Sequence, residues 1–165
     1  MIRTNNITFS YKDCSDIEDL NTADRKLLIS AREAAKNAYA PYSRFKVGAA
    51  LRLESGIIVT GVNIENAAFP SGICAERSAL AGASSGHPGD IPVALAIAAL
   101  TDSGLCDDPV SPCGNCRQVI AEEESRNSRN IRIILGGKNK IRIIEKGEDL
   151  LPLSFSKDFL KINPL

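Results

Sequence analysis

Three cysteines and one glutamate stand at spacings that suit metal chemistry. Cys113 and Cys116 are separated by one helical turn. Cys74 lies upstream, two residues before Glu76. A C-x-x-C pair alone is equally typical of a redox dithiol, of two buried cysteines or of a metal site. The third cysteine favours a metal, because three protein ligands leave the fourth tetrahedral position of zinc open for water, as in catalytic zinc sites.

Two charged side chains follow shortly after Cys74. The carboxylate of Glu76 can take a proton from a metal-bound water and deliver it to a substrate nitrogen. An acidic residue in the first turn of a helix also favours the helix dipole without any further role. Zinc with three thiolates carries a net negative charge, which weakens its ability to acidify water. Arg77 is therefore the candidate to offset that charge.

Both groups of cysteines are predicted to lie where helices begin. From Cys74 to about Gly86 the sequence is alanine-rich and helical in character. Pro112 suits the first turn of another helix, with Ser111 as its predicted N-cap. The unpaired N–H groups and the dipole of a helix N-terminus lower the pKa of a thiol. Two helix starts can therefore bring three thiolates together.

The remaining segments predict a layered α/β domain. A helix capped by Thr22 is expected to end at Pro41. A hairpin follows, with its turn at residues 54–56, and the continuous apolar run at 92–100 suits a strand that is covered on both faces. The predicted strands fall within residues 45–53, 57–63, 92–100, 130–135 and 140–145. Helices interleaved with five strands indicate a mixed sheet.

The composition limits the possible function classes. The chain has 165 residues, and its 20 basic and 20 acidic side chains cancel. It lacks the basic excess of nucleic-acid binders, so we expect a small-molecule partner and no nucleic acid. No apolar run has the length of a signal peptide or a membrane span, so we expect no membrane partner and a cytoplasmic protein. Five cysteines, an odd number, argue against a disulfide framework.

The polar residues 1–21 read as an N-terminal extension, which leaves residues 22–165 as the domain. Four stretches are similar to the small, homotetrameric cytidine deaminases: NIENAAFPSGICAERSAL, SPCGNCRQV, AYAPYSRFKVGAAL and LLPLSF. The first two contain the zinc deaminase motif, in which a ligand precedes a glutamate by two residues and a Pro-Cys-x-x-Cys segment follows. The resemblance implies a cytidine-deaminase-like, three-layer α/β/α fold with a five-stranded mixed sheet.

The resemblance also implies a reaction, the hydrolytic deamination of cytidine and 2′-deoxycytidine to uridine and 2′-deoxyuridine plus ammonia, in pyrimidine salvage. Cys74, Cys113 and Cys116 would hold one Zn²⁺ per subunit. Glu76 would move protons while a zinc-bound hydroxide adds to C4 of the pyrimidine. The alternatives are a deaminase of a modified cytosine nucleoside or a blasticidin-like antibiotic, and a zinc-stabilised interaction module without turnover.

Substrate contacts follow from the same resemblance. Asn63 and Glu65 would hydrogen-bond the ribose hydroxyls. Phe45 would pack against the pyrimidine, and the backbone of Ala75 would contact the base. Phe155 would reach the pocket of a neighbouring subunit, in a homotetramer with shared active sites. On their own, these residues are also typical of a polar loop and of ordinary apolar packing.

Three cationic or amide side chains correspond to positions that steady the metal site in this family: Arg77, Arg117 and Gln118. Arg117 alone would read equally well as an exposed helix residue. The chain departs from the family pattern at two places. Phe69 stands where tyrosine is frequent, and Asn115 replaces the small residue that is usual between the two downstream cysteines.

Overall fold

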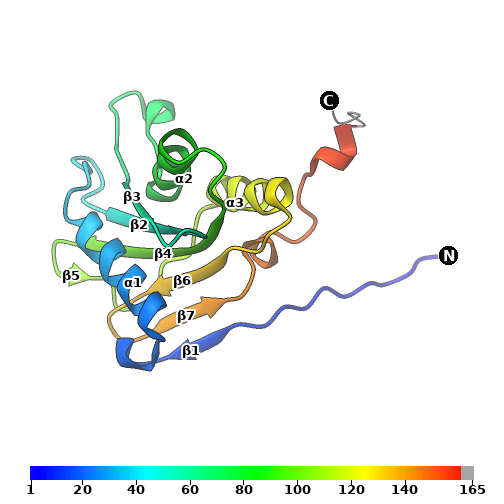
Figure 1. Cartoon of the computed structure of the whole chain (residues 1–165), viewed down its shortest axis with the longest axis horizontal. Coiled ribbons are helices and arrows are strands. Elements are labelled where there is room, and N and C mark those ends of the chain that lie inside the picture. The colour runs from blue at the N-terminus through cyan, green and yellow to red at the C-terminus, as the bar shows by residue number, and fades with distance from the viewer. Residues whose placement is uncertain (161–165) are drawn as a thin grey trace.

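The computed structural model describes residues 1–160, which form a seven-stranded mixed sheet with helices on both faces (Figure 1). The strands are β1 (Lys12–Cys14), β2 (Lys46–Leu53), β3 (Ile58–Val62), β4 (Pro92–Thr101), β5 (Gly104–Leu105), β6 (Arg132–Gly136) and β7 (Ile141–Ile144). Their order is β1-β7-β6-β4-β2-β3, with β5 paired to β4. β4 and β6 run parallel, and the other neighbours are antiparallel. The last residues of the predicted domain, 161–165, lie outside the described chain.

The α-helices of the described chain are α1 (Thr22–Ala35), α2 (Ala75–Gly86) and α3 (Gly114–Asn127). Figure 1 shows α1 against one face of the sheet and α2 and α3 against the other. This arrangement confirms the predicted α/β fold, with a mixed sheet flanked by helices. None of these helices combines the length and the apolar character that crossing a membrane requires, within the part of the chain that the structure describes.

Two helix starts differ from the prediction. α1 is capped one residue earlier than expected, because the side chain of Asn21 accepts the backbone N–H of Asp24 at 2.9 Å. α3 begins later than a cap at Ser111 would place it. The carbonyl of Cys113 accepts the first helical N–H, that of Arg117, at 2.9 Å, so Cys113 is the N-cap.

The sheet has two more strands than the five that were predicted. All five predicted strands are present, and the short strands β1 and β5 are added to them. β1 carries charged residues and shows no apolar alternation, so the pattern of residues 12–14 does not indicate a strand. It pairs antiparallel with β7, and two ion pairs accompany this pairing, between Lys12 and Glu145 at 2.9 Å and between Asp13 and Arg142 at 2.9 Å.

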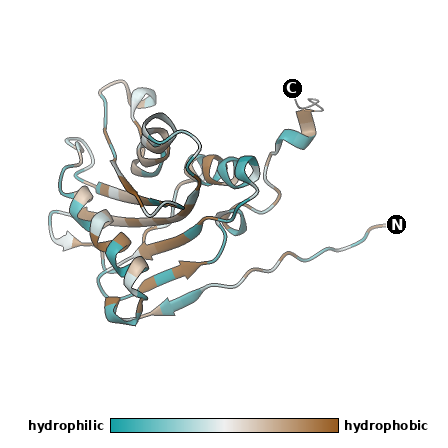
Figure 2. Ribbon diagram, viewed as in Figure 1, coloured by the Kyte–Doolittle hydropathy of each residue, from teal (hydrophilic) through white to brown (hydrophobic). Residues whose placement is uncertain are grey.

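The central strand β4 is buried on both faces, as its apolar run predicts. Leu95 and Ile97 belong to the core that packs under α2 and α3. Ala94, Ala96 and Ala98 belong to the core under α1. Figure 2 shows the apolar residues concentrated in these central strands. The site described below therefore stands on a rigid, doubly covered sheet.

Candidate active site

The three predicted metal ligands meet where α2 and α3 begin. Cys74 is the N-cap of α2, Cys113 is the N-cap of α3, and Cys116 lies one turn further along α3. The Sγ atom of Cys113 lies 3.9 Å from that of Cys74 and 3.5 Å from that of Cys116. All three sulfurs lie within 4.8 Å of one another. The N-cap sulfur of Cys74 makes no side-chain cap hydrogen bond to its own helix.

Close packing against β3 fixes the start of α2. A Cβ atom added at Gly61 would lie 2.4 Å from the carbonyl oxygen of Ala75, so only glycine permits this approach. Just before the helix, Ile73 and Ile64 exchange two backbone hydrogen bonds of 3.0 Å. The backbone that leads into Cys74 is therefore tied to the chain that leaves β3.

The prediction that a helix start lowers the pKa of these thiols holds for Cys113 alone, because burial dominates at Cys74 and Cys116. Burial raises the pKa of Cys74, and burial together with the Glu76 carboxylate raises the pKa of Cys116. At Cys113 burial is outweighed by hydrogen bonds, foremost from the backbone N–H of Cys116, and the pKa is lowered. Zn–S bonds of about 2.3 Å in a tetrahedron place the sulfurs about 3.8 Å apart, close to the distances between these thiols. The donor set and its spacing therefore fit zinc, which binds cysteine as thiolate.

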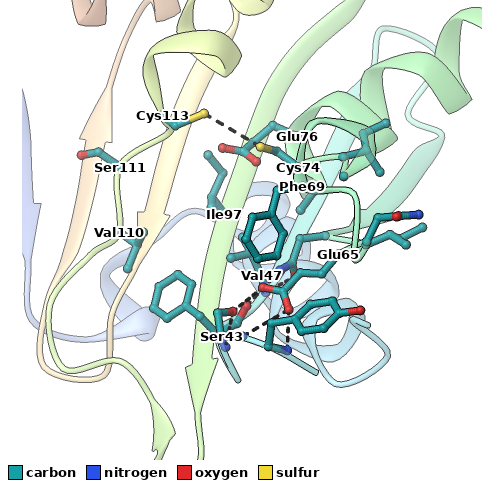
Figure 3. A pocket seen from close by; sticks show the side chains of 18 residues that line it. Ser43, Val47, Glu65, Phe69, Cys74, Glu76, Ile97, Val110, Ser111 and Cys113 are labelled. Carbon is teal, nitrogen blue, oxygen red and sulfur yellow. Dashed lines mark hydrogen bonds between the residues drawn. The ribbon is translucent and has the colours of Figure 1, made fainter. Parts of the chain in front are cut away.

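Glu76 stands beside this cluster. Its residue is only 5% exposed, and Figure 3 shows its carboxyl group next to the Cys74 sulfur, facing the space toward Cys113. Burial raises the pKa of Glu76 above that of a free glutamate. A carboxyl group with a raised pKa accepts and releases a proton closer to neutral pH, which suits a general acid–base.

A pocket of about 730 Å³ opens from the cysteines toward the loops after α1 and β3 (Figure 3). The predicted residues that line it are Phe45, Asn63, Glu65, Cys74, Ala75, Glu76 and Cys113. Cys116 is fully buried within α3. None of the described residues that line the pocket is lysine, arginine or histidine.

Asn63 lines the pocket next to the start of β2. Its Oδ1 accepts the backbone N–H of Val47 at 2.7 Å, and its Nδ2 donates to the carbonyl of Phe45 at 2.9 Å. These bonds hold the start of β2 and therefore the Phe45 ring, which lines the pocket. A carboxamide has two donors and about two acceptor sites, so one of each remains for a ligand.

Glu65 is engaged with the loop before β2. Its Oε2 accepts the backbone N–H groups of Tyr42 at 2.9 Å and Ser43 at 3.2 Å, and its Oε1 accepts the hydroxyl of Ser43. The hydroxyl and the two N–H groups lower the pKa of Glu65. The carboxylate is therefore ionised at neutral pH, and it keeps about one acceptor position for a ligand.

Sequence reasoning missed Ser43 and Tyr42 as pocket residues. Both lie in the polar turn before β2, and nothing in that turn indicates the acidic partner 22 residues away. Tyr42 also contacts Phe69, with ring centroids 5.9 Å apart at 74°. Phe69 is 75% exposed and lines the pocket, whereas Asn115 is exposed at the start of α3.

Phe155 does not line the pocket of its own chain. It is 58% exposed and stacks on Phe159, with ring centroids 5.9 Å apart. Figure 1 shows this C-terminal segment projecting from the body. Gln118 of α3 donates a hydrogen bond from Nε2 to the carbonyl of Phe155 at 2.8 Å, so it holds the base of that segment.

Arg117 connects the metal loop to the C-terminal segment. Its Nε donates to the carbonyl of Pro112 at 2.8 Å, and its Nη1 donates to the carbonyl of Leu150 at 2.9 Å. The residue next to Cys113 is therefore held by a planar guanidinium, which has the fork geometry for two such bonds. Arg77 is half-buried in the first turn of α2, and its predicted charge-offsetting role stays a prediction.

The sequence and the structure of this chain are similar to those of known cytidine deaminases. Residues 21–129 match the model of the cytidine and deoxycytidylate deaminase zinc-binding region. A cytidine deaminase of Halalkalibacterium halodurans is 50% identical over 100 residues, which are 60% of this chain and 71% of that protein. A cytidine deaminase of Sporosarcina psychrophila is 43% identical over 135 residues, which are 82% of this chain and 93% of that protein.

Solved structures show the same architecture. The crystal structure of cytidine deaminase from Burkholderia pseudomallei matches with a TM-score of 0.68 and 38% sequence identity. The match covers 79% of this chain and 97% of that one. The structure of cytidine deaminase from Mycobacterium tuberculosis matches with a TM-score of 0.64 and 32% identity.

Proposed function

The chain belongs to the cytidine and deoxycytidylate deaminase zinc-binding family, and we propose that it deaminates cytidine and 2′-deoxycytidine hydrolytically. The products are uridine or 2′-deoxyuridine and ammonia, and the reaction serves pyrimidine salvage in the cytoplasm. The observation that carries the proposal is that three cysteines and the buried Glu76 lie together beside a pocket of about 730 Å³.

The metal end supplies the reacting water. Cys74, Cys113 and Cys116 would hold zinc, which when bound would polarise a water molecule and make it a better nucleophile. Arg77, in the first turn of α2, offsets part of the negative charge of the three thiolates. Arg117 holds the loop that carries Cys113 through the Pro112 carbonyl.

Glu76 moves the protons. It takes one proton from the attacking water as the new C–O bond forms at C4 of the pyrimidine, and delivers that proton to N3. It then transfers the remaining hydroxyl proton to the amino group, the C4–N bond breaks, and ammonia leaves. A pKa raised by burial lets the same carboxyl group act first as base and then as acid near neutral pH.

The other end of the pocket binds the sugar. The unused donor and acceptor of Asn63 and the remaining acceptor position of Glu65 match the hydroxyl groups of a ribose, each of which can donate and accept. The ring of Phe45 packs against the pyrimidine, and the backbone of Ala75 contacts the base. The bonds of Asn63 and Glu65 to the chain hold these groups in place before the substrate arrives.

The charge of the pocket favours a nucleoside over a nucleotide. The lining residues include the carboxylates of Glu65 and Glu76 but none of the described lining residues is cationic. A phosphate group on the 5′ position would meet negative charge and no arginine or lysine to bind it. Free cytidine and 2′-deoxycytidine therefore suit the pocket better than their monophosphates.

We further propose that the active protein is a homotetramer with shared active sites. The exposed Phe155 on its projecting segment is then the residue that enters the pocket of a neighbouring copy. Complementation tests this arrangement. A mixture of Glu76→Gln and Phe155→Ala chains, refolded together, should regain part of the activity that neither variant has alone. No regain in co-assembled chains would contradict the sharing.

The test of the reaction is to incubate the purified protein with cytidine and follow the loss of its ultraviolet absorbance, with ammonia and zinc measured on the same sample. We expect about one zinc per chain and stoichiometric uridine and ammonia. The same assay with cytidine 5′-monophosphate should show far lower kcat/KM. Zinc-loaded protein that converts neither nucleoside would refute the proposal.

A further inference from the structure

Residues 1–11, called here the N-terminal arm, leave the body as an extended segment that continues β1 (Figure 1). Every residue of the arm is exposed, including Ile7 at 59%, Phe9 at 46% and Tyr11 at 51%. Within the described range 1–160, the backbone of residues 1–10 forms no hydrogen bond to another residue. The arm therefore has both backbone edges open.

The sequence of the arm has the pattern of a half-buried strand. Ile7, Phe9 and Tyr11 alternate with the polar Thr8 and Ser10, and side chains two residues apart lie on one face of a strand. The rings of Phe9 and Tyr11 have centroids 6.3 Å apart, in agreement with a shared face. In a single copy of the chain this face stays about half exposed, and Arg142 lies over its Tyr11 ring.

The arm begins at a well-anchored point. Asp13 accepts two hydrogen bonds of 2.9 Å from Arg142, and the guanidinium of Arg142 lies 4.3 Å from the centroid of the Tyr11 ring. β7 ends at Ile144, so the sheet of the same chain provides no neighbour for the rest of the arm. The position and direction of the arm are thus set at its base, while its edges stay unpaired.

We propose that the arm pairs antiparallel with the arm of a second copy of this chain, with Phe9 on the twofold axis. Residue i then faces residue 18 − i, and residues 4–6 of each copy lie along the open edge of β1 in the other. Ile7 faces Tyr11 and Phe9 faces Phe9. Only this register makes all three apolar residues face one another, so the arm is complementary to itself, as a twofold interface requires.

The charges agree with the same register. The charged residues of the paired segment each face a neutral residue of the other copy: Arg3 faces Ser15, Lys12 faces Asn6 and Asp13 faces Asn5. No like charges are opposed, which would destabilise a strand pair. The two sheets would join through β1 into one continuous sheet, and the exposed edge strands would be covered.

Cross-linking tests the register. Phe9→Cys places two sulfurs opposite each other on the axis, within the range of a disulfide. Ser10→Cys is the matched control, because its two copies are displaced by two residues along the strands. We expect mild oxidation to give a covalent dimer with Phe9→Cys, and neither with Ser10→Cys nor with the unaltered chain. Equal cross-linking of both variants, or none with Phe9→Cys, overturns the proposal.

Charge substitutions test the contribution of the arm to assembly. Phe9→Asp brings two like charges together on the axis, whereas Thr8→Asp adds the same charge on the other face, opposite Ser10. We expect Phe9→Asp to weaken association roughly tenfold in sedimentation equilibrium, and Thr8→Asp to change it much less. Equal effects of the two substitutions would contradict the paired strand. Both side chains are exposed, so neither change should disturb the core.

This proposal and the deaminase proposal fail separately. Cross-linking and sedimentation report on the arm alone, whereas zinc content and cytidine turnover report on the active site. A chain that cross-links at position 9 but converts no cytidine would refute only the reaction. A chain that deaminates cytidine but shows no cross-link at this position would refute only the arm pairing.

Discussion

The two ends of the pocket are built differently. At the metal end, side chains project from the first turns of two helices packed on the sheet, and Cys116 and Glu76 are 0% and 5% exposed. At the sugar end, Asn63 uses half and Glu65 uses most of its side-chain hydrogen-bonding positions to hold residues 42–47. In the proposed mechanism the reacting groups therefore stand on rigid elements, whereas the groups proposed to bind the sugar also hold the loop beside it.

Loss of a ligand at the metal end should have the largest effect. Cys116→Ser removes the buried thiolate, so we expect zinc content to fall well below one per chain and turnover to be abolished. Cys106→Ser is the matched control, because Cys106 is half-buried and does not line the pocket. Metal analysis and the cytidine assay check both variants. Full zinc content in Cys116→Ser would show that two cysteines suffice.

Glu76→Gln should separate proton transfer from metal binding. The amide keeps the size of the side chain but cannot accept and release a proton, so we expect kcat to fall by about 10²–10⁴-fold. Zinc content should stay at the level of the unaltered chain. A variant with unchanged kcat would mean that Glu76 only favours the helix dipole, which was the alternative reading of the sequence.

Substitutions at the sugar end should change KM rather than kcat. Glu65→Gln removes the charge that accepts the Tyr42 and Ser43 N–H groups and that we propose to bind the ribose. We therefore expect KM for cytidine to rise roughly 10–100-fold, the range for a charged hydrogen bond. Ser43→Ala removes only the hydroxyl donor and should raise KM less. An equal fall in kcat and kcat/KM for Glu65→Gln would move this residue to the reacting centre.

Glu65 should also make the stability of the folded chain depend on pH. Its pKa in the folded chain is lowered, first by the Ser43 hydroxyl, so the ionised form favours folding. This contribution is fully present above the ordinary value of 4.5 and is lost as the pH falls through the lowered pKa. Thermal unfolding of the unaltered chain and of Glu65→Gln should therefore differ at pH 7 and converge in acid. A constant difference would mean that the carboxylate does not titrate with folding.

The same contrast explains what the sequence could predict. Cys113 and Cys116 stand three residues apart, so helical geometry alone brings their sulfurs together, and the motif with Cys74 completes the set. The bond between Ser43 and Glu65 joins residues 22 apart in two loops, and no local pattern encodes it. The start of α3 was placed too early because the N-cap Cys113 gives no side-chain capping signal.

Short elements were missed for a similar reason. β1 and β5 have three and two residues, too few to show an apolar alternation. β1 pairs antiparallel with β7 and forms ion pairs with Arg142 and Glu145, about 130 residues further along the chain. The sequence therefore predicts the elements that bury apolar faces, but not those that are held by contacts between distant polar residues.

The smallest expected effect lies at the rim of the sugar end. Phe69→Tyr adds a hydroxyl to a ring that is 75% exposed, and the edge contact with Tyr42 can persist. We expect the free energy of unfolding to change by no more than about 0.5 kcal/mol, as for other surface substitutions. The kcat/KM for cytidine should change less than about threefold, since one exposed hydrogen bond contributes little. A larger gain in kcat/KM would show that residue 69 contributes to binding the sugar. The sugar end would then include, besides Asn63 and Glu65, an exposed ring that the neighbouring copy can cover.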